Sequence, residues 1–253
     1  LVALQEGRIT PAFSSPCIPE IIGCHKHPYP SSLKHGIQYS CNGYFYAVFK
    51  KIMEPAYGSS FEQAHSNLAK WRKYMLEMGF GTTLNIDYPF HRSGFIPDTS
   101  YYDKIYGYKK WAFSTIYSLS IGQGEVLLTP LHIANFAAFI ANRGKYKVPH
   151  FQKRIPGLVS SPVDTIHWNI SSIDRKHFDA VIEGLTAVVE EPGGTAYMSK
   201  IPGIKMAGKT GTAENPHGED HALFFAFAPV DTPRIAISVI VENAGFGGTW
   251  AAP

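Results

Sequence analysis

The chain has 253 residues, of which 45% are hydrophobic and 17% are charged, and its formal net charge is +3. A chain of this size and apolar content can bury a substantial core, as one large domain or two small ones. The charge balance is mild and no basic run is clustered, which argues against a nucleic-acid-binding protein. No apolar run approaches the roughly 20 residues that span a bilayer.

The N-terminal part is expected to be mainly loop. Residues 1–7 continue a helix that Gly7 can end. Residues 10–30 contain five prolines and scattered serines, which predicts a long ordered loop. Residues 37–42 then turn into the next helix.

Two helices are predicted in the following stretch. The aromatic run over residues 43–49 indicates a buried helix. Over residues 62–78, apolar residues recur at helical spacing between charged ones, so this segment is predicted to be an amphipathic surface helix that Gly79 ends. Residues 81–110 are rich in Gly, Pro, Tyr and Asp, which predicts an extended loop region. This region is expected to form a wall of a substrate groove. Its tyrosines can equally pack inside the protein, which is the commoner outcome.

The second half combines helices with a sheet. Thr129 and Pro130 begin a helix of small residues that ends near residue 143, and residues 146–156 continue in extended form. Another helix is predicted from residue 172 to the Pro-Gly-Gly at 192–194. The nearly continuous apolar runs that follow predict strands over residues 221–229 and 234–243, in a sheet covered by helices on both faces. The predicted fold class is α/β of the α+β type: an antiparallel sheet flanked by helices, plus a helical subdomain.

The stretch before these strands carries the main chemical signal. Lys209, Thr210, Gly211 and Thr212 are expected to form the edge strand of the sheet. Because strand side chains alternate, the two threonines share one face, and Lys209 and Gly211 share the other. Gly211 leaves room for an extended peptide added as a strand, while the hydroxyls and the ammonium can hold its carboxylate.

A second motif lies upstream, at Ser40-Cys41-Asn42. Taken alone, Ser40 and Asn42 suit a helix-capping pair. However, Ser-x-Asn followed by Lys-Thr-Gly forms two of the three motifs of penicillin-interacting serine enzymes, in their order. Together with residues 121–126 and 192–196, these motifs resemble the transpeptidase domain of class B penicillin-binding proteins of the elongation type. The resemblance covers essentially the whole chain, residues 1–253, and implies their transpeptidase fold, which serine β-lactamases share.

The resemblance implies a peptidoglycan D,D-transpeptidase that cross-links stem peptides by acyl transfer from D-Ala-D-Ala and binds penicillin. In that family Ser40 would relay a proton to the leaving group, Asn42 would bond the substrate amide, and Lys209 would support Ser40. Thr210 and Thr212 would bond the terminal carboxylate, with the Thr212 N–H as one oxyanion donor. His221, beside two acidic residues, is interpreted as structural, because the family uses lysine as its base.

The family's first motif, Ser-x-x-Lys, marks a departure. In the family, the nucleophilic serine begins a helix whose continuation resembles residues 1–7, so the chain is expected to start just after its nucleophile and to be inactive alone. The literal match at Ser31–Lys34 lies in a proline-rich, loop-like stretch and is interpreted as chance. Residues 245–253 resemble a linker into a closing helix, so the chain is interpreted as a partial domain.

The resemblance also implies partners and a location. The expected partners are peptidoglycan stem peptides, β-lactam antibiotics and a membrane glycan polymerase of the elongation machinery, with a membrane anchor N-terminal to the chain. The implied location is the periplasmic face of the bacterial inner membrane. Two alternatives stay open: a serine β-lactamase or β-lactam sensor domain, and a non-catalytic module that binds stem peptide.

The cysteines and histidines of the first loop leave the cofactor open. The family's oxidising compartment allows a Cys17–Cys24 disulfide, although three cysteines cannot all pair. Zinc is the other interpretation, since some elongation-type relatives carry a metal near this loop. Cys24, His25 and His27 are the main candidate ligands, with Cys17 or His35 available to complete four. A loop of ordinary histidines with no cofactor is the simplest interpretation.

Overall fold

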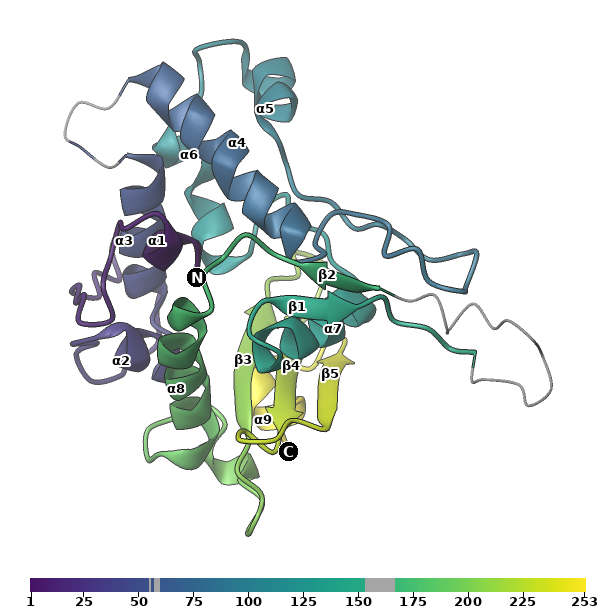
Figure 1. The fold of residues 1–253 in the computed structure, drawn as a ribbon. Coiled ribbons are helices and arrows are strands. Elements are labelled where there is room, and N and C mark those ends of the chain that lie inside the picture. Colours follow the sequence, from purple (N-terminus) through teal and green to yellow (C-terminus); the bar gives the residue numbers. More distant parts are fainter. Residues whose placement is uncertain (55, 57–59, 153–166) are drawn as a thin grey trace.

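The computed structural model describes residues 1–54, 56, 60–152 and 167–253, which form a mostly helical part and a sheet part (Figure 1). The helical part contains α1 (Val2–Gln5), α2 (Leu33–Gln38), α3 (Asn42–Met53), α4 (Phe61–Glu77), α5 (Thr99–Tyr106), α6 (Phe113–Ile116) and the 3-10 helix η1 (Tyr117–Ile121). The helices of the sheet part are α7 (Pro130–Ala141), α8 (Lys176–Glu190), η3 (Tyr197–Ser199) and α9 (Gly247–Trp250). None of the described helices combines the length and the apolarity needed to cross a membrane.

The main sheet has three antiparallel strands, β3 (Ala207–Ala213), β4 (His221–Ala228) and β5 (Ile235–Val241), in the order β3-β4-β5. The predicted strands are therefore confirmed, and β3 is an edge strand as expected. Helix α7 packs against β4 and β5, and α8 packs against β3. The expectation of full cover on both faces fails at β5, where Ile235 and Ile237 remain 59% and 36% exposed.

A second, two-stranded sheet was only half predicted. Strand β1 (Lys145–Lys147) pairs antiparallel with β2 (Trp168–Ile170). All residues of β2 are exposed, so β2 lacks the apolar alternation that marks a strand in a sequence. The last residues of the predicted extended segment, 153–156, lie outside the described part of the chain.

Two helices appear where the sequence predicts loop. Helix α5 forms inside residues 81–110, because the Asp98 carboxylate caps it by accepting a hydrogen bond from the Tyr101 N–H at 2.8 Å. Tyr102 is fully buried and donates to the Glu125 carboxylate at 2.9 Å, so the packing interpretation of these tyrosines holds for it. Helix α2 begins directly after Ser32, whose hydroxyl accepts from the backbone N–H of His35.

Helix α8 connects the sheet to the segment that carries the Ser-x-Asn motif. Its apolar face is buried as predicted. At Gly184, in the middle of α8, a Cβ atom would lie 2.8–2.9 Å from atoms of the Ile37 side chain, so the absent side chain lets α2 approach closely. The Gln38 amide donates to the Pro192 carbonyl at 3.0 Å. Helix α2 leads directly to Ser40, and α8 packs against β3. The close approach of α2 to α8 at Gly184 therefore helps to set the distance between Ser40 and β3.

Candidate active site

A pocket of about 770 Å³ lies at the junction of the helical part and β3. The six residues predicted for catalysis and substrate binding all line it: Ser40, Asn42, Lys209, Thr210, Gly211 and Thr212. The two motifs are thus brought together from positions about 170 residues apart, as a single site requires. The described residues of the 81–110 segment do not line this pocket.

Lys209 connects the two motifs. Its ammonium donates hydrogen bonds to Ser40 Oγ at 2.5 Å and to the backbone oxygen of Thr210 at 2.8 Å. Burial of the ammonium lowers the pKa of Lys209 to about 8, because the charged form loses its hydration. At neutral pH, the Lys209 side chain is therefore mostly protonated, and it releases its proton more readily than an ordinary lysine.

Ser40 does not cap a helix, contrary to the simpler interpretation of its motif. The residue before α3 is Cys41, whose sulfur accepts from the Tyr44 N–H at 3.3 Å. Ser40 itself has a φ of 51°, in the left-handed region that non-glycine residues rarely adopt and that clusters at functional sites. Its hydroxyl faces the ammonium of Lys209.

Asn42 is the first residue of α3, and the loop between Cys17 and Cys24 fixes its side chain. Its Nδ2 donates to the Gly23 carbonyl at 2.7 Å. Asn42 lines the pocket, and its Oδ1 has no hydrogen-bond partner within the described part of the chain. That oxygen is free to accept a hydrogen bond from an amide N–H of a substrate.

Three residues that the sequence did not assign to the site hold β3 in place. Thr195 and Thr210 share a hydrogen bond between their hydroxyls at 2.6 Å, and Thr210 is only 8% exposed. The Gln123 amide donates to the Thr212 carbonyl at 2.9 Å. At Gly247 any Cβ would collide with backbone oxygens of β3 and β4, so only glycine allows this close packing. The runs 121–126 and 192–196, noted only for their family resemblance, were the available signal for Gln123 and Thr195.

The remaining sequence candidates lie away from the reacting groups. His221 Nδ1 accepts from the Asn243 N–H at 3.1 Å and does not line the pocket, in agreement with a structural role. In the literal Ser-x-x-Lys match, Ser31 Oγ contacts the His35 ring at 2.9 Å, whereas Lys34 forms an ion pair with Glu191 at 2.8 Å. Neither residue of this match lines the pocket.

A cluster of metal-ligating side chains adjoins the site. Cys17, Cys24, His27 and Cys41 each offer one ligand atom, and these atoms all lie within 4.8 Å of one another. All three thiols are free, so the structure contains no Cys17–Cys24 disulfide. Tetrahedral zinc with Zn–S bonds of about 2.3 Å requires ligands roughly 4 Å apart, which this cluster fits. The sequence candidate His25 lies outside it and packs edge-on against His27, with ring centroids 5.2 Å apart.

The complete chain, residues 1–253, matches the family model for the penicillin binding protein transpeptidase domain. The chain belongs to this family, and its mixed helix and antiparallel-sheet fold agrees with the predicted class.

Relatives and solved structures agree with this placement. The chain is 31% identical over 241 residues to the peptidoglycan D,D-transpeptidase MrdA of Haemophilus influenzae, covering 88% of this chain and 35% of that protein. The crystal structure of Pseudomonas aeruginosa PBP2 in complex with WCK 5153 superposes with a TM-score of 0.78 at 29% identity, covering 99% of this chain and 56% of that one. A structure of a peptidoglycan synthase complex that coordinates polymerization and crosslinking is also similar. It gives a TM-score of 0.77 at 25% identity, covering 99% of this chain and 42% of that one. The chain spans about a third of the length of the curated relatives it matches.

Proposed function

We propose that the protein is a peptidoglycan D,D-transpeptidase of cell-wall elongation, which takes the acyl group from a stem peptide ending in D-Ala-D-Ala and is acylated by penicillin. The observation that carries the proposal is the hydrogen bond from Lys209 to Ser40, which joins the two motifs across one pocket. Family membership and the likeness to MrdA favour a synthase over a serine β-lactamase, a β-lactam sensor or a non-catalytic binding module.

The geometry suggests a role for each side chain in the transfer. The terminal carboxylate of the donor binds to the Lys209 ammonium and to the hydroxyls of Thr210 and Thr212, while Asn42 Oδ1 accepts from a donor amide N–H. A serine oxygen then bonds to the carbonyl carbon while a general base takes the proton of that hydroxyl, the C–N bond to the last D-Ala breaks, and the departing amine takes a proton. Ser40 supplies that proton, and Lys209 replaces it because its pKa of about 8 lies close to neutral pH.

The test uses intact-mass analysis with benzylpenicillin, on this chain and on the full-length product of its gene. If Ser40 relays protons and is not the nucleophile, the chain gains no adduct and the full-length product gains one stable adduct. Lys209→Ala should slow acylation of the full-length product about 100-fold or more, whereas the matched control Lys205→Ala, an exposed lysine just before β3, should leave the rate unchanged.

Each alternative gives a distinct result in the same experiment. An adduct mapped to Ser40 would make Ser40 the nucleophile. Rapid release of hydrolysed penicillin would indicate a β-lactamase. A folded full-length product that binds stem peptide without forming any adduct would indicate a non-catalytic module.

We infer that the full-length product works with a membrane glycan polymerase of the elongation machinery, on the periplasmic face of the bacterial inner membrane. The likeness to the synthase complex that coordinates polymerization and crosslinking supports this inference. Purification of the full-length product from detergent-solubilised membranes should recover a glycan polymerase with it. Recovery of the product alone under mild conditions would contradict the inference.

We also propose that Cys17, Cys24, His27 and Cys41 hold one zinc ion, since three thiolates and an imidazole form a set that zinc prefers. When bound, the ion would supply structural cross-linking and no reaction step. It would tie the Cys17–Cys24 loop to the start of α3, and this loop carries the Gly23 carbonyl that holds Asn42.

Zinc content measured by emission spectroscopy checks this proposal. One zinc per chain is expected, with loss of most of it in Cys24→Ser and in His27→Ala. His25→Ala is the matched control and should keep its zinc. A zinc content near zero in freshly purified, folded protein would overturn the proposal.

A further inference from the structure

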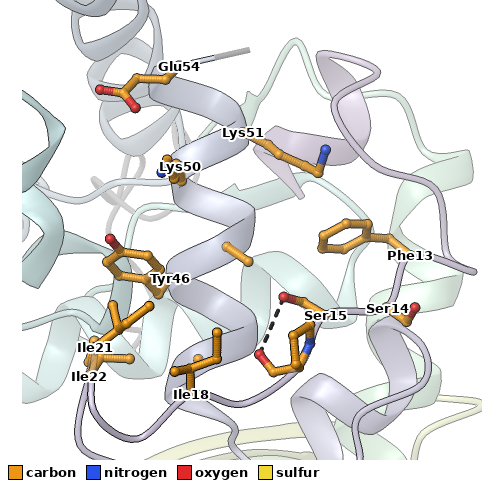
Figure 2. A pocket seen from close by; sticks show the side chains of 13 residues that line it. Phe13, Ser14, Ser15, Ile18, Ile21, Ile22, Tyr46, Lys50, Lys51 and Glu54 are labelled. Atoms are coloured by element: carbon orange, nitrogen blue, oxygen red, sulfur yellow. Dashed lines mark hydrogen bonds between the residues drawn. The ribbon is translucent and has the colours of Figure 1, made fainter. Parts of the chain in front are cut away.

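A second pocket, of about 430 Å³, lies between helix α3 and the loop over residues 13–22 (Figure 2). Among the described residues, it shares no lining residue with the active-site pocket. Its volume falls within the range of about 300–1,000 Å³ that is typical of small-molecule sites. Neither the transpeptidase reaction nor the metal cluster uses this space.

The walls of this pocket are largely apolar. Figure 2 shows Phe13 on one side of α3, and Tyr46 with Ile21 and Ile22 on the other. Ile18 and Ile21 are 42% and 49% exposed, although they line a concave surface. Covering such apolar surface is favourable by about 25 cal/mol per Å², so the pocket favours a ligand with an apolar body.

The rim of the pocket adds a positive charge. Lys50 and Lys51 lie in the last turn of α3, and the Lys51 ammonium is 5.4 Å from the centroid of the Phe13 ring. Neither lysine forms an ion pair with any residue in the described parts of the chain. With Glu54, the described residues that line the pocket carry a net charge of +1. The rim therefore complements a ligand that carries one negative charge.

The shape of the pocket depends on the close approach of loop and helix. At Gly43, in the first turn of α3, a Cβ atom would lie 3.0 Å from the Cys17 Cα and 3.2 Å from the Ile18 nitrogen. The loop can therefore lie directly on the helix. The isoleucines of the pocket wall fall between Cys17 and Cys24, two residues of the metal-ligating cluster, so both ends of this wall are fixed against α3.

We propose that this pocket binds a small organic monoanion with an apolar body, such as an aromatic carboxylate or sulfonate. The apolar part lies against Phe13, Tyr46 and the isoleucines, and the anionic group pairs with a rim ammonium, that of Lys51 on the Phe13 side of α3 or that of Lys50 on the Tyr46 side. The site is separate from the proposed transpeptidase site, so either proposal can fail without the other.

The first experiment locates the site with the probe 1-anilinonaphthalene-8-sulfonate, which has an aromatic body and one sulfonate. Isoleucine-methyl NMR follows its binding to the protein. We expect saturable shifts at Ile18, Ile21 and Ile22. A third, mainly apolar pocket of about 320 Å³ is lined by Ile37 and Ile140, which serve as internal controls. Shifts at Ile37 and Ile140 without shifts at the pocket isoleucines would overturn the proposal.

The second experiment tests recognition of the charge. The double variant Lys50→Gln/Lys51→Gln should weaken sulfonate binding about tenfold or more and leave binding of the uncharged probe N-phenyl-1-naphthylamine unchanged. The matched control Lys104→Gln/Lys110→Gln removes two exposed lysines outside the pocket and should bind both probes like the wild type. Equal affinity of the wild type and the Lys50/Lys51 variant for the sulfonate would refute the anion site.

A third arm tests steric access and the class of ligand. Ala47 lies on the pocket side of α3, so Ala47→Trp should abolish the methyl shifts while the protein stays folded. 2-Naphthoate should displace the sulfonate probe. Displacement by acidic peptides but not by naphthoate would replace the small-anion ligand with a protein partner and so overturn the proposal.

Discussion

Two properties of the site depend on the protonation state of one side chain, Lys209. Its ammonium lies within hydrogen-bond distance of Ser40 and of the Thr210 carbonyl, while burial lowers its pKa to about 8. Two properties follow from this one environment. Lys209 can attract a carboxylate when protonated, and it can accept and return a proton near neutral pH.

The lowered pKa of Lys209 predicts a specific dependence of stability on pH. An unfolded lysine has a pKa of about 10.4, so between pH 8 and 10.4 the unfolded state binds more protons than the folded state. The penalty for burying the charged form is complete below pH 8 and is relieved as the pH rises through this window. Relative to Lys209→Met, the free energy of unfolding of the wild type should rise by roughly 1–3 kcal/mol from pH 8 to pH 10.

Urea denaturation at several pH values measures this difference. Thiols and tyrosines titrate in the same range, but their contributions cancel between the wild type and the variant. Lys205→Met is the matched control, and its difference from the wild type should not change with pH. A flat or falling difference for Lys209→Met would show that the Lys209 pKa is not lowered.

The hydroxyl of Thr210 should matter for one group of the ligand only. In Thr210→Val the pocket loses a donor to the substrate carboxylate, and hydrogen bonds to charged groups contribute about 1.5–3 kcal/mol. Binding of a stem peptide ending in D-Ala-D-Ala should therefore weaken about tenfold or more, as measured by NMR titration. The same peptide with a C-terminal carboxamide should bind the wild type and the variant equally well. An equal loss for both peptides would assign Thr210 to packing.

At the scale of elements, the sequence predicts those whose stability comes from a regular pattern. Helices α3, α4, α7 and α8 and strands β4 and β5 carry apolar patterns and lie at the predicted places, and β3 is predicted from its position just before these strands. Helix α5 is short and lies within a Gly- and Pro-rich segment, and β2 is exposed throughout, so neither carries such a pattern. The formation of these two elements depends on tertiary contacts and, for α5, on a single capping residue.

The sequence predicts the site residues that belong to local motifs and misses those whose role depends on contacts between separate segments. The Lys-Thr-Gly and Ser-x-Asn motifs are local, and every motif residue lines the pocket. The contacts of Gln123, Thr195 and Gly247 join separate segments of the chain, so the family-like runs 121–126 and 192–196 point to Gln123 and Thr195 without revealing what these residues contact. The metal cluster includes Cys41 and His27 but not His25, because the backbone path of the loop decides which of two near neighbours points inward.

The α2–α8 contact gives a prediction at this scale. Although Ala favours a helix over Gly, the added methyl group of Gly184→Ala would lie 2.8–2.9 Å from Ile37 atoms and force α2 away. We expect a net loss of about 1–3 kcal/mol in the free energy of unfolding, together with slower penicillin acylation of the full-length product. Ile37→Val in the Gly184→Ala background should restore part of both. Additive effects of the two substitutions would show that the residues do not interact.

At the scale of the whole molecule, the active site is assembled from two parts. The helical part supplies Ser40 and Asn42, and the sheet part supplies Lys209 and the threonines of β3 (Figure 1). Neither part holds a complete site, so the binding of a ligand that bridges them stabilises their contact.

Hydrogen exchange can test this assembly. Stem peptide at saturating concentration should slow exchange in β3 and at the start of α3 together, because the ligand contacts both. The β1–β2 sheet, which does not line the pocket, serves as the internal reference and should exchange at an unchanged rate. Protection of β3 alone would mean that the peptide binds the sheet edge without engaging the Ser-x-Asn motif.

The close contact between Gly184 and Ile37 has a consequence for selection by antibiotics. Substitutions that alter this contact are expected to move Ser40 relative to Lys209 without changing any residue that lines the active-site pocket. If penicillin acylates the protein as proposed, such substitutions would alter drug susceptibility from positions behind the pocket, and a survey restricted to the pocket lining would overlook them.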